Sequence, residues 1–169
     1  MFYNILMSKL ITIAVDAMGG DNSPSKVING INLHSQSNKN VFYKIFGNTD
    51  IIKNIIPKTL LTSSFELINT KEEVKGTDSP LGAAKKGNNT SMWLAIESVK
   101  KKESDIIISA GNTGALFVIA KLNLKMLENI DKPALSGLWP NKKGINIVLD
   151  LGANIECSEK NLVDFSLMG

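Results

Sequence analysis

The sequence predicts an α/β fold built on an open, mostly parallel β-sheet. Apolar runs of strand length alternate with segments of helix length along most of the 169-residue chain, which is the order expected of strand–helix–strand units. Three of the apolar runs end in polar loops that contain glycine, at residues 16–22, 109–114 and 150–154. Because open parallel sheets bind ligands beyond the carboxyl ends of their strands, we expect these three loops to converge on one site.

The first strand and helix are indicated by an apolar run followed by a helix-start signal. Residues 10–15 read as a strand buried on both faces, because the run is apolar without alternation. The glycine-rich loop 16–22 follows it. Ser23 then predicts a helix N-cap with Pro24 at the first helical position, and the helix is expected to run to about residue 36.

The middle of the chain continues the alternation. Strands are predicted at residues 41–46 and 65–68, with a short helix over residues 50–55 between them. Residues 70–90 are polar over a length unusual for a plain connector, which predicts a functional or mobile loop. A helix beginning near Thr90 carries an apolar stripe and ends in three lysines, which suit the negative end of the helix dipole.

The last third predicts one more buried strand, a nearly all-apolar helix and a hairpin. The strand is residues 106–109, and the helix over 113–127 is so apolar that it should be buried or lie in an interface. Strands at 133–138 and 145–149, joined through residues 139–144, predict the hairpin. Ser158 is expected to cap a final helix.

The turn Ser109–Ala115, of sequence SAGNTGA, is the strongest candidate for a ligand site. A strand that passes through Gly111 and Gly114 directly into a helix leaves backbone N–H groups and the positive end of the helix dipole facing one spot. This arrangement suits a phosphate-like anion. The alternative is an ordinary strand-to-helix turn with glycine at positions of unusual φ, and the motif alone does not decide between them.

Composition excludes several other functions. All 19 basic residues are lysine, the net charge is only +3, and no basic stripe with aromatic residues occurs, so nucleic acid is not expected as a partner. Any anion must be held by N–H groups, Lys, Ser, Thr or Asn, because arginine is absent. The single cysteine fits a reducing compartment. The chain carries no metal-ligand cluster or Ser-His-Asp candidate, and we expect neither a metal nor a cofactor.

The N-terminal apolar stretch does not predict a signal peptide or a membrane span. It is interrupted by Lys9, ended by Asp16, and too short to cross a bilayer. We therefore expect a cytoplasmic chain in which residues 1–9 form an extension, with Met7 as an alternative start to Met1.

Several polar and aromatic residues are not expected to take part in the reaction. Carboxylates beside tight turns commonly accept bonds from backbone N–H groups, so the predicted loop-structuring carboxylates are Asp16, Asp21 and Asp150. The remaining side chains are interpreted as bystanders: Cys157 as a buried or inert thiol, His34 as a surface residue, and Trp93 and Trp139 as packing residues.

Three motifs together resemble a known family. DAMGGD at residues 16–21, SAGNTGA at 109–115 and LDLGAN at 149–154 occur in this order. With these motifs, the chain from about residue 10 to residue 169 is similar to the bacterial phosphate acyltransferases of phospholipid synthesis.

The resemblance implies a three-layer α/β/α sandwich, similar to phosphotransacetylases and isocitrate-dehydrogenase-like enzymes, usually as a homodimer. The implied reaction transfers a fatty acyl group from acyl carrier protein to inorganic phosphate. The acyl phosphate formed would feed a membrane-bound glycerol-3-phosphate acyltransferase, which implies work in the cytoplasm or at the inner face of the membrane.

Two features depart from the family. Its members are about twice as long, so residues 10–169 are expected to be an incomplete, N-terminal part of the acyltransferase domain, cut inside a helix. Members also tend to carry Arg and Lys before an Asp-Ser-Ser-Met-like segment, where this chain has KKGNNTSM at residues 85–92. Its lysines can meet phosphate only as point charges.

The site residues follow from that reaction, which needs a held phosphate and donors for the developing oxyanion. The predicted phosphate-binding residues are Gly111, Asn112, Thr113 and Gly114. The predicted catalytic residues are Asn112, Thr113, Lys85 and Asn154, with Lys85 neutralising charge and Asn154 orienting phosphate or the acyl carbonyl. Gly19, Gly20 and Gly152 are expected to shape the neighbouring loops.

Two other functions stay open at this point. A chain that keeps the core of the fold without the rest of the cleft would be an inactive remnant of the enzyme. A simple phosphate- or nucleotide-binding module is the second alternative, although the Gly-x-Gly-x-x-Gly fingerprint of dinucleotide-binding folds is absent.

Overall fold

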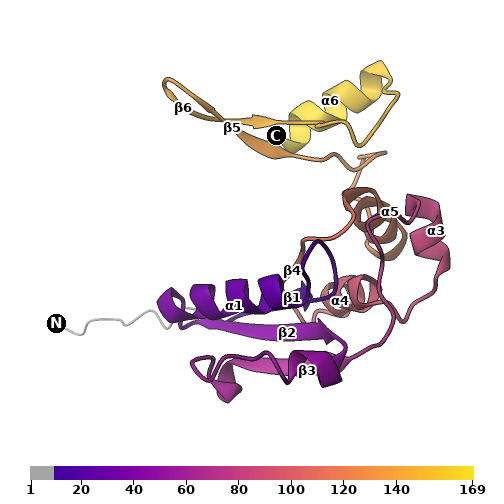
Figure 1. The fold of residues 1–169 in the computed structure, drawn as a ribbon. Helices are drawn as coiled ribbons and strands as arrows, with labels where there is room; N and C mark the ends of the chain where they lie inside the picture. The colour runs from indigo at the N-terminus through magenta and orange to yellow at the C-terminus, as the bar shows by residue number, and fades with distance from the viewer. Residues whose placement is uncertain (1–9) are drawn as a thin grey trace. The chain divides into compact units, whose positions relative to one another are not determined.

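The computed structural model describes residues 10–169, so the predicted extension over residues 1–9 lies outside the described part. Within it the chain forms two compact units, one ending at Asn123 and the other spanning Leu124–Gly169 (Figure 1). Each unit is described separately below.

A four-stranded sheet is the centre of the first unit. Its strands are β1 (Ile11–Asp16), β2 (Val41–Gly47), β3 (Phe65–Asn69) and β4 (Ile106–Ser109). They lie in the order β3-β2-β1-β4, and all three neighbouring pairs are parallel. The register places Asp16 of β1 opposite Ser109 of β4. The polar ends of these two strands therefore meet at the same edge of the sheet.

Helices cover both faces of this sheet, which confirms the predicted three-layer α/β/α architecture. On one face, α1 (Ser25–Ser37) packs over β1 and β2 (Figure 1). On the other, Ala95 of α4 (Ser91–Lys100) packs against Ala14 and Phe46. The first face holds the larger apolar core, formed by Ile13, Val15, Ala17, Ile28, Ile31, Tyr43, Ile45, Ile52 and Leu60.

The predicted N-cap of the first helix is wrong. Helix α1 begins at Ser25, Pro24 takes the cap position, and no side chain caps the helix. The Ser23 hydroxyl instead donates a 2.6 Å hydrogen bond to the Gly19 carbonyl. Ser23 thus stabilises the glycine-rich loop that precedes the helix.

The polar stretch 70–90 contains a helix that the sequence reading missed. Helix α3 (Pro80–Lys85) begins with Pro at its first turn, and the Ser79 hydroxyl accepts a hydrogen bond from the Gly82 N–H. Helix α4 follows and begins at Ser91, in line with the predicted start near Thr90, and the Thr90 side chain caps it. The short helices α2 (Thr49–Ile52) and η1 (Thr62–Ser64) complete the connections of the first unit.

Helix α5 (Thr113–Asn123) begins where predicted and ends four residues earlier than the predicted 127. Ala115 and Ile119 are buried, whereas Leu122 is 63% exposed. The helix is therefore buried along one face in this chain, and part of its apolar surface is open.

The second unit consists of a hairpin and one helix. Strands β5 (Gly137–Asn141) and β6 (Gly144–Val148) pair antiparallel around a turn at Lys142–Lys143, which is tighter than the predicted loop. Helix α6 (Glu159–Met168) is capped by Ser158, as predicted, in a reciprocal capping box with Asn161. Trp139 is 61% exposed, so its prediction as a packing residue is wrong for this chain.

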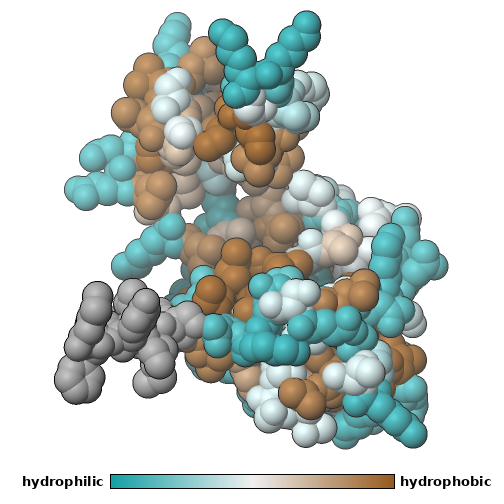
Figure 2. All heavy atoms as spheres, turned by 90° about the vertical axis from the view of Figure 1, so that its left-hand side faces the viewer, coloured by the Kyte–Doolittle hydropathy of each residue, from teal (hydrophilic) through white to brown (hydrophobic). Residues whose placement is uncertain are grey.

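Apolar side chains reach the surface of both units on the face shown in Figure 2. No helix within residues 10–169 is both long and apolar enough to span a bilayer.

Candidate functional site

A buried carboxylate joins the ends of three elements in the first unit. Asp16, at the end of β1, is only 1% exposed. Its Oδ1 accepts a 2.6 Å hydrogen bond from the Ser91 hydroxyl at the start of α4, and its Oδ2 accepts a 2.8 Å bond from the Ser109 hydroxyl at the end of β4. The Met18 N–H donates to Oδ1 at 3.3 Å. Because burying a carboxylate is costly unless it is hydrogen-bonded, these contacts give Asp16 a positioning role.

Two glycines let the first two polar loops touch. A Cβ added to Gly19 would lie 2.6 Å from the Asp16 Oδ2 and 3.0 Å from the Gly111 Cα, distances that leave no room for a side chain. Gly20 has a φ of +93°, in the region that favours glycine. Loop 16–22 and turn 109–114 therefore lie against each other, as predicted for these two of the three loops.

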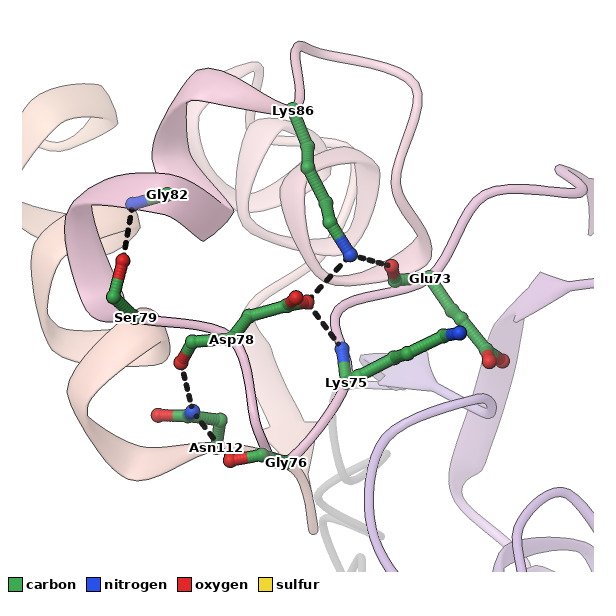
Figure 3. Close-up of polar contacts among 8 residues, drawn as sticks. All are labelled: Glu73, Lys75, Gly76, Asp78, Ser79, Gly82, Lys86 and Asn112. Carbon is green, nitrogen blue, oxygen red and sulfur yellow. Dashed lines mark hydrogen bonds and ion pairs between the residues drawn. The ribbon is translucent and has the colours of Figure 1, made fainter.

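Asn112 fixes the start of helix α5 and ties it to a neighbouring loop. Its Oδ1 accepts a 3.0 Å hydrogen bond from the Ala115 N–H, and its Nδ2 donates to the carbonyls of Gly76 and Asp78 at 3.1 and 2.9 Å (Figure 3). A helix start leaves four N–H groups without intrahelical acceptors. With the Ala115 N–H taken by the side chain, those of residues 112–114 are the groups left for a ligand.

An ion pair holds the loop that Asn112 contacts. The Lys86 ammonium lies 2.5 Å from the Asp78 carboxylate and donates a longer bond to the Glu73 carbonyl (Figure 3). The Lys75 N–H donates to the same carboxylate at 2.7 Å. The hydrogen bond from Lys86, with that from Lys75, lowers the pKa of Asp78 below its ordinary value. Asp78 therefore stays charged at neutral pH.

The lysine that holds this loop is Lys86, the residue after the predicted catalytic Lys85. Lys85 is exposed at the end of α3, whereas Lys86 makes the contacts to Asp78 and Glu73. The pairing of Asp78 with Lys86 had no signal in the sequence, because it depends on the unpredicted helix between them. A catalytic role for Lys85 stays a prediction.

These loops surround a polar cavity of about 380 Å³. Loop 16–22 contributes Met18, Gly20 and Asp21, the loop over residues 73–76 contributes a second wall, and the turn at 110–112 contributes the third. Lys75 is the basic residue in the lining of this cavity, and Asp21 and Glu73 are its acidic residues. The cavity can thus take a small, oxygen-rich ligand against the start of α5.

The third predicted loop lies in the second unit and is organised around Asp150. Its carboxylate accepts 2.7 Å hydrogen bonds from the N–H groups of Leu135 and Asn154, and a 3.0 Å bond from the Asn154 side chain. Burial raises the pKa of Asp150, but these hydrogen bonds together outweigh burial and place its pKa below the ordinary value. Gly152 has a φ of +89°. Asp150 therefore structures its loop, in line with its predicted role.

Asn154 is engaged within this loop. Its Nδ2 donates to the Pro133 carbonyl at 2.9 Å as well as to Asp150. Its predicted role in orienting phosphate, and the convergence of its loop with the other two, stay predictions.

The predicted bystander His34 does not line the polar cavity. His34 is exposed and its Nδ1 lies 2.6 Å from the Tyr43 hydroxyl, which confirms it as a surface residue. Cys157 is exposed. Within residues 10–169 no group of three or more His, Cys, Asp or Glu side chains is placed to hold a metal ion.

Comparison with known proteins places the chain in a family. A family model described as "Fatty acid synthesis protein" matches residues 11–169, which include every loop described above. The chain belongs to this fatty acid synthesis protein family. The family resemblance drawn from the three motifs is confirmed by relatives that carry the name phosphate acyltransferase.

Three relatives show how much of each chain the match covers. The phosphate acyltransferase of Pelagibacter ubique strain HTCC1062 is 73% identical over 163 residues, which cover 96% of this chain and 49% of the relative. That of Rhodospirillum rubrum is 42% identical over 96% of this chain and 47% of its own length, and that of Ehrlichia ruminantium strain Gardel is 41% identical over 98% and 50%. The chain thus spans about half the length of the curated relatives it matches.

Proposed function

We propose that the chain is part of a phosphate acyltransferase that moves a fatty acyl group from acyl carrier protein to inorganic phosphate. The product is an acyl phosphate, which a membrane-bound acyltransferase then uses to acylate glycerol 3-phosphate. We place the enzyme in the cytoplasm or at the inner face of the membrane, as a homodimer. The proposal extends the relatives' name, phosphate acyltransferase, to a donor and a product.

The observation that carries the proposal is the polar cavity that Asn112 lines and whose neighbouring loops are fixed by the hydrogen bonds of Asp16. A phosphate that attacks a thioester must be held with one oxygen aimed at the carbonyl carbon, and preorganised donors achieve this without reorganisation during the reaction. The buried bonds of Asp16 fix two loops, and Asn112 fixes the third wall and the helix start. We propose that the N–H groups of residues 112–114 and the Thr113 hydroxyl hold the phosphate at the start of α5, where Asn112 lines the cavity.

In the reaction that we propose, a phosphate oxygen forms a bond to the thioester carbonyl carbon. The carbon–sulfur bond breaks and the thiol of the carrier protein leaves with a proton. Lys75 at the cavity favours the phosphate dianion and offsets part of the charge of Asp21 and Glu73, which also line it. Lys86 neutralises the nearby Asp78. Neither a covalent enzyme intermediate nor a histidine is required.

The test uses a full-length chimera, in which residues 11–169 of this chain replace the matching stretch of the Pelagibacter ubique relative. The purified chimera is given acyl carrier protein loaded with a fatty acyl group, together with inorganic phosphate, and acyl phosphate is trapped with hydroxylamine. We expect product that depends on both substrates. Absence of product from a folded chimera contradicts the proposal.

A single substitution then tests the phosphate site. Thr113→Val removes the hydroxyl but keeps the shape, and it should lower the rate about 100- to 1000-fold, the scale seen when one donor to the reacting anion is lost. Thr62→Val, at an exposed position in η1, is the matched control and should retain the rate. Thr113→Val is the better probe than Gly111→Val, because a side chain at Gly111 would press on Gly19 and Met92. Near-normal turnover after Thr113→Val contradicts the assignment.

The same assay on the chain by itself separates the enzyme from the inactive remnant. If the chimera is active and the chain alone is not, the site in this chain needs the rest of the enzyme for activity. A chain that binds phosphate while its chimera forms no acyl phosphate supports the simple binding module instead.

A further inference from the structure

The hydroxyl of Ser109 belongs to the SAGNTGA motif but has no part in the proposed reaction. Ser109 is the last residue of β4, and the strand register places it opposite Asp16. Its Oγ donates the 2.8 Å hydrogen bond to the Asp16 carboxylate and also accepts a 3.1 Å bond from the Gly111 N–H. The side chain therefore connects the buried carboxylate to the turn that begins the candidate phosphate site.

The two partners of Ser109 fix the direction of both hydrogen bonds. A hydroxyl has one proton to donate and lone pairs that accept, whereas a carboxylate only accepts and a backbone N–H only donates. The proton of Ser109 therefore points at Asp16, and a lone pair faces the Gly111 N–H. Because Asp16 is 1% exposed, water has little access to the carboxylate, and the hydroxyl keeps this orientation.

The peptide group between Ala110 and Gly111 is held on both sides. Its N–H is the group bonded to Ser109. Its carbonyl oxygen lies so close to Gly20 that a Cβ added there would collide with it. Successive peptide planes are joined only through the φ and ψ of the residue between them. The orientation of this peptide group therefore helps to set the directions of the N–H groups that follow, at residues 112–114.

We propose that Ser109 is a positioning residue for the phosphate acyltransferase reaction. It holds the Ala110–Gly111 peptide group so that the N–H groups of residues 112–114 point at the phosphate. It does so through Asp16 and Gly111, and it is not among the residues that line the polar cavity. The inference rests on the proposed function and deepens it, because preorganised donors act without reorganisation during the reaction.

Steady-state kinetics of the full-length chimera test this role. Ser109→Ala should raise the KM for inorganic phosphate about five- to tenfold, the effect of losing one hydrogen bond of ordinary strength. The KM for the acyl-loaded carrier protein should not change, because Ser109 acts only through the phosphate-holding turn. A purely structural role would reduce the amount of active enzyme, and therefore kcat, without raising the KM for phosphate alone.

Two further variants at this position sharpen the result. Ser109→Thr keeps the hydroxyl and should restore the KM for phosphate to within about twofold of the wild-type value. Ser109→Cys has a similar size but a weaker donor and acceptor, and it replaces Ser109→Ala if the alanine variant fails to fold. A raised KM for phosphate in Ser109→Thr equal to that in Ser109→Ala would contradict a role for the hydroxyl.

Two other serines serve as comparisons. Ser98→Ala, at a 3% exposed position of α4, removes a 2.8 Å bond to Ser104 away from the cavity and should leave both KM values unchanged. Ser91→Ala takes the other serine hydroxyl from Asp16 but leaves the bond of Gly111 in place. Its effect on the KM for phosphate should therefore be smaller. An equal effect in Ser91→Ala would assign the change to Asp16 and overturn the role of Ser109.

A phosphate titration of the chain followed by ¹H–¹⁵N NMR gives a readout that needs no activity. In Ser109→Ala the dissociation constant for phosphate should rise about five- to tenfold, and the Gly111 amide should exchange faster with solvent because it has lost its acceptor. Weaker phosphate binding in Ser109→Ala, with a chimera that forms no acyl phosphate, contradicts the proposed function and supports the role of Ser109. An active chimera whose KM for phosphate is unchanged in Ser109→Ala overturns that role alone. Absence of both phosphate binding and activity overturns both.

Discussion

Different interactions stabilise each of the two units of this chain. The first has buried apolar clusters on both faces of a parallel sheet, whereas Phe165 is the only buried apolar side chain that the described residues place in the second. The second unit relies on polar contacts, among them the pairing of Lys160 with Asp131 and Asp164. Exposed ion pairs contribute little to stability compared with apolar burial. The first unit therefore has its own core, and the second unit depends on being covered.

The hairpin of the second unit shows the same contrast. Leu138 lies opposite Ile147 and Pro140 opposite Ile145, so the four share one face of the ribbon. Leu138, Ile145 and Ile147 are all more than half exposed. A two-stranded hairpin is marginally stable unless its apolar face packs against something. Apolar residues thus indicate strands in both units, but only β1 and β2 of the first unit bury them.

The largest expected effect compares one isoleucine from each unit. Ile45→Ala, at a fully buried position, should lower the free energy of unfolding by about 2–5 kcal/mol, because it leaves a cavity in the core. Ile147→Ala, at a position 56% exposed, should cost less than about 0.5 kcal/mol. Each unit has one tryptophan, Trp93 or Trp139, so urea unfolding of single-tryptophan variants reports on each unit separately. An equal loss of unfolding free energy in Ile45→Ala and Ile147→Ala would contradict the difference between the two units.

The next effect comes from the carboxylate that joins three elements. Asp16→Ala leaves the hydroxyls of Ser91 and Ser109 without their acceptor, and Ser91 is itself buried. At about 1–3 kcal/mol for an unsatisfied buried group, the first unit should lose about 2–4 kcal/mol. The exposed Asp21 provides the control, since Asp21→Ala should change stability by less than about 0.5 kcal/mol. A small effect of Asp16→Ala would show that the loops are fixed by something else.

A smaller loss is expected where the two loops touch. Gly19→Val forces a side chain against the Asp16 carboxylate and the Gly111 backbone, and it should cost about 1–3 kcal/mol in the first unit. Gly30→Ala is the control, because open space surrounds that position on α1 and alanine favours a helix. Thermal unfolding monitored through Trp93 measures both. A stable Gly19→Val variant would mean that the loops can separate.

The smallest expected effect is the dependence of the second unit's stability on pH. The pKa of Asp150 lies below its ordinary value of 3.8 in the folded chain, so the unfolded chain takes up the proton first as the pH falls. The stabilisation is present above the unfolded pKa and is lost as the pH falls through the lower folded pKa. Unfolding followed through Trp139 should become easier below about pH 4, and less steeply so in Asp150→Asn.

Glu156→Gln, an exposed side chain of the same unit, controls for the loss of one negative charge. If wild type and Asp150→Asn respond identically to acid, the hydrogen bonds to Asp150 do not stabilise the loop.

The sequence predicted local structure well where periodicity and caps were clear. The strands of the first unit, the helix start near Thr90, the cap at Ser158 and the two glycine loops follow from short patterns. Helix α3 was missed because a polar composition concealed the start signal of Ser79 and Pro80. Ser23 was misread because its hydroxyl had a competing acceptor, the Gly19 carbonyl, that only the folded loop provides.

The hydrogen bonds of Asp16 could not be predicted from short stretches of sequence. Asp16 could be recognised as a loop-structuring carboxylate, but its partners Ser91 and Ser109 lie 75 and 93 residues away in sequence. Polar residues at the ends of a strand and a helix were the only signal. Contacts of this range depend on strand order, which a single sequence leaves open.

Binding of inorganic phosphate to the isolated chain tests the central claim most directly. In a titration followed by ¹H–¹⁵N NMR, the account predicts saturable shifts centred on the amides of Gly111–Gly114, and loss of these shifts in Asn112→Asp, which places a negative charge at the helix start. Asn29→Asp, on the exposed side of α1, should leave them intact. Shifts confined to the lysine-rich segments, or none at residues 111–114, would contradict the claim that this turn holds phosphate.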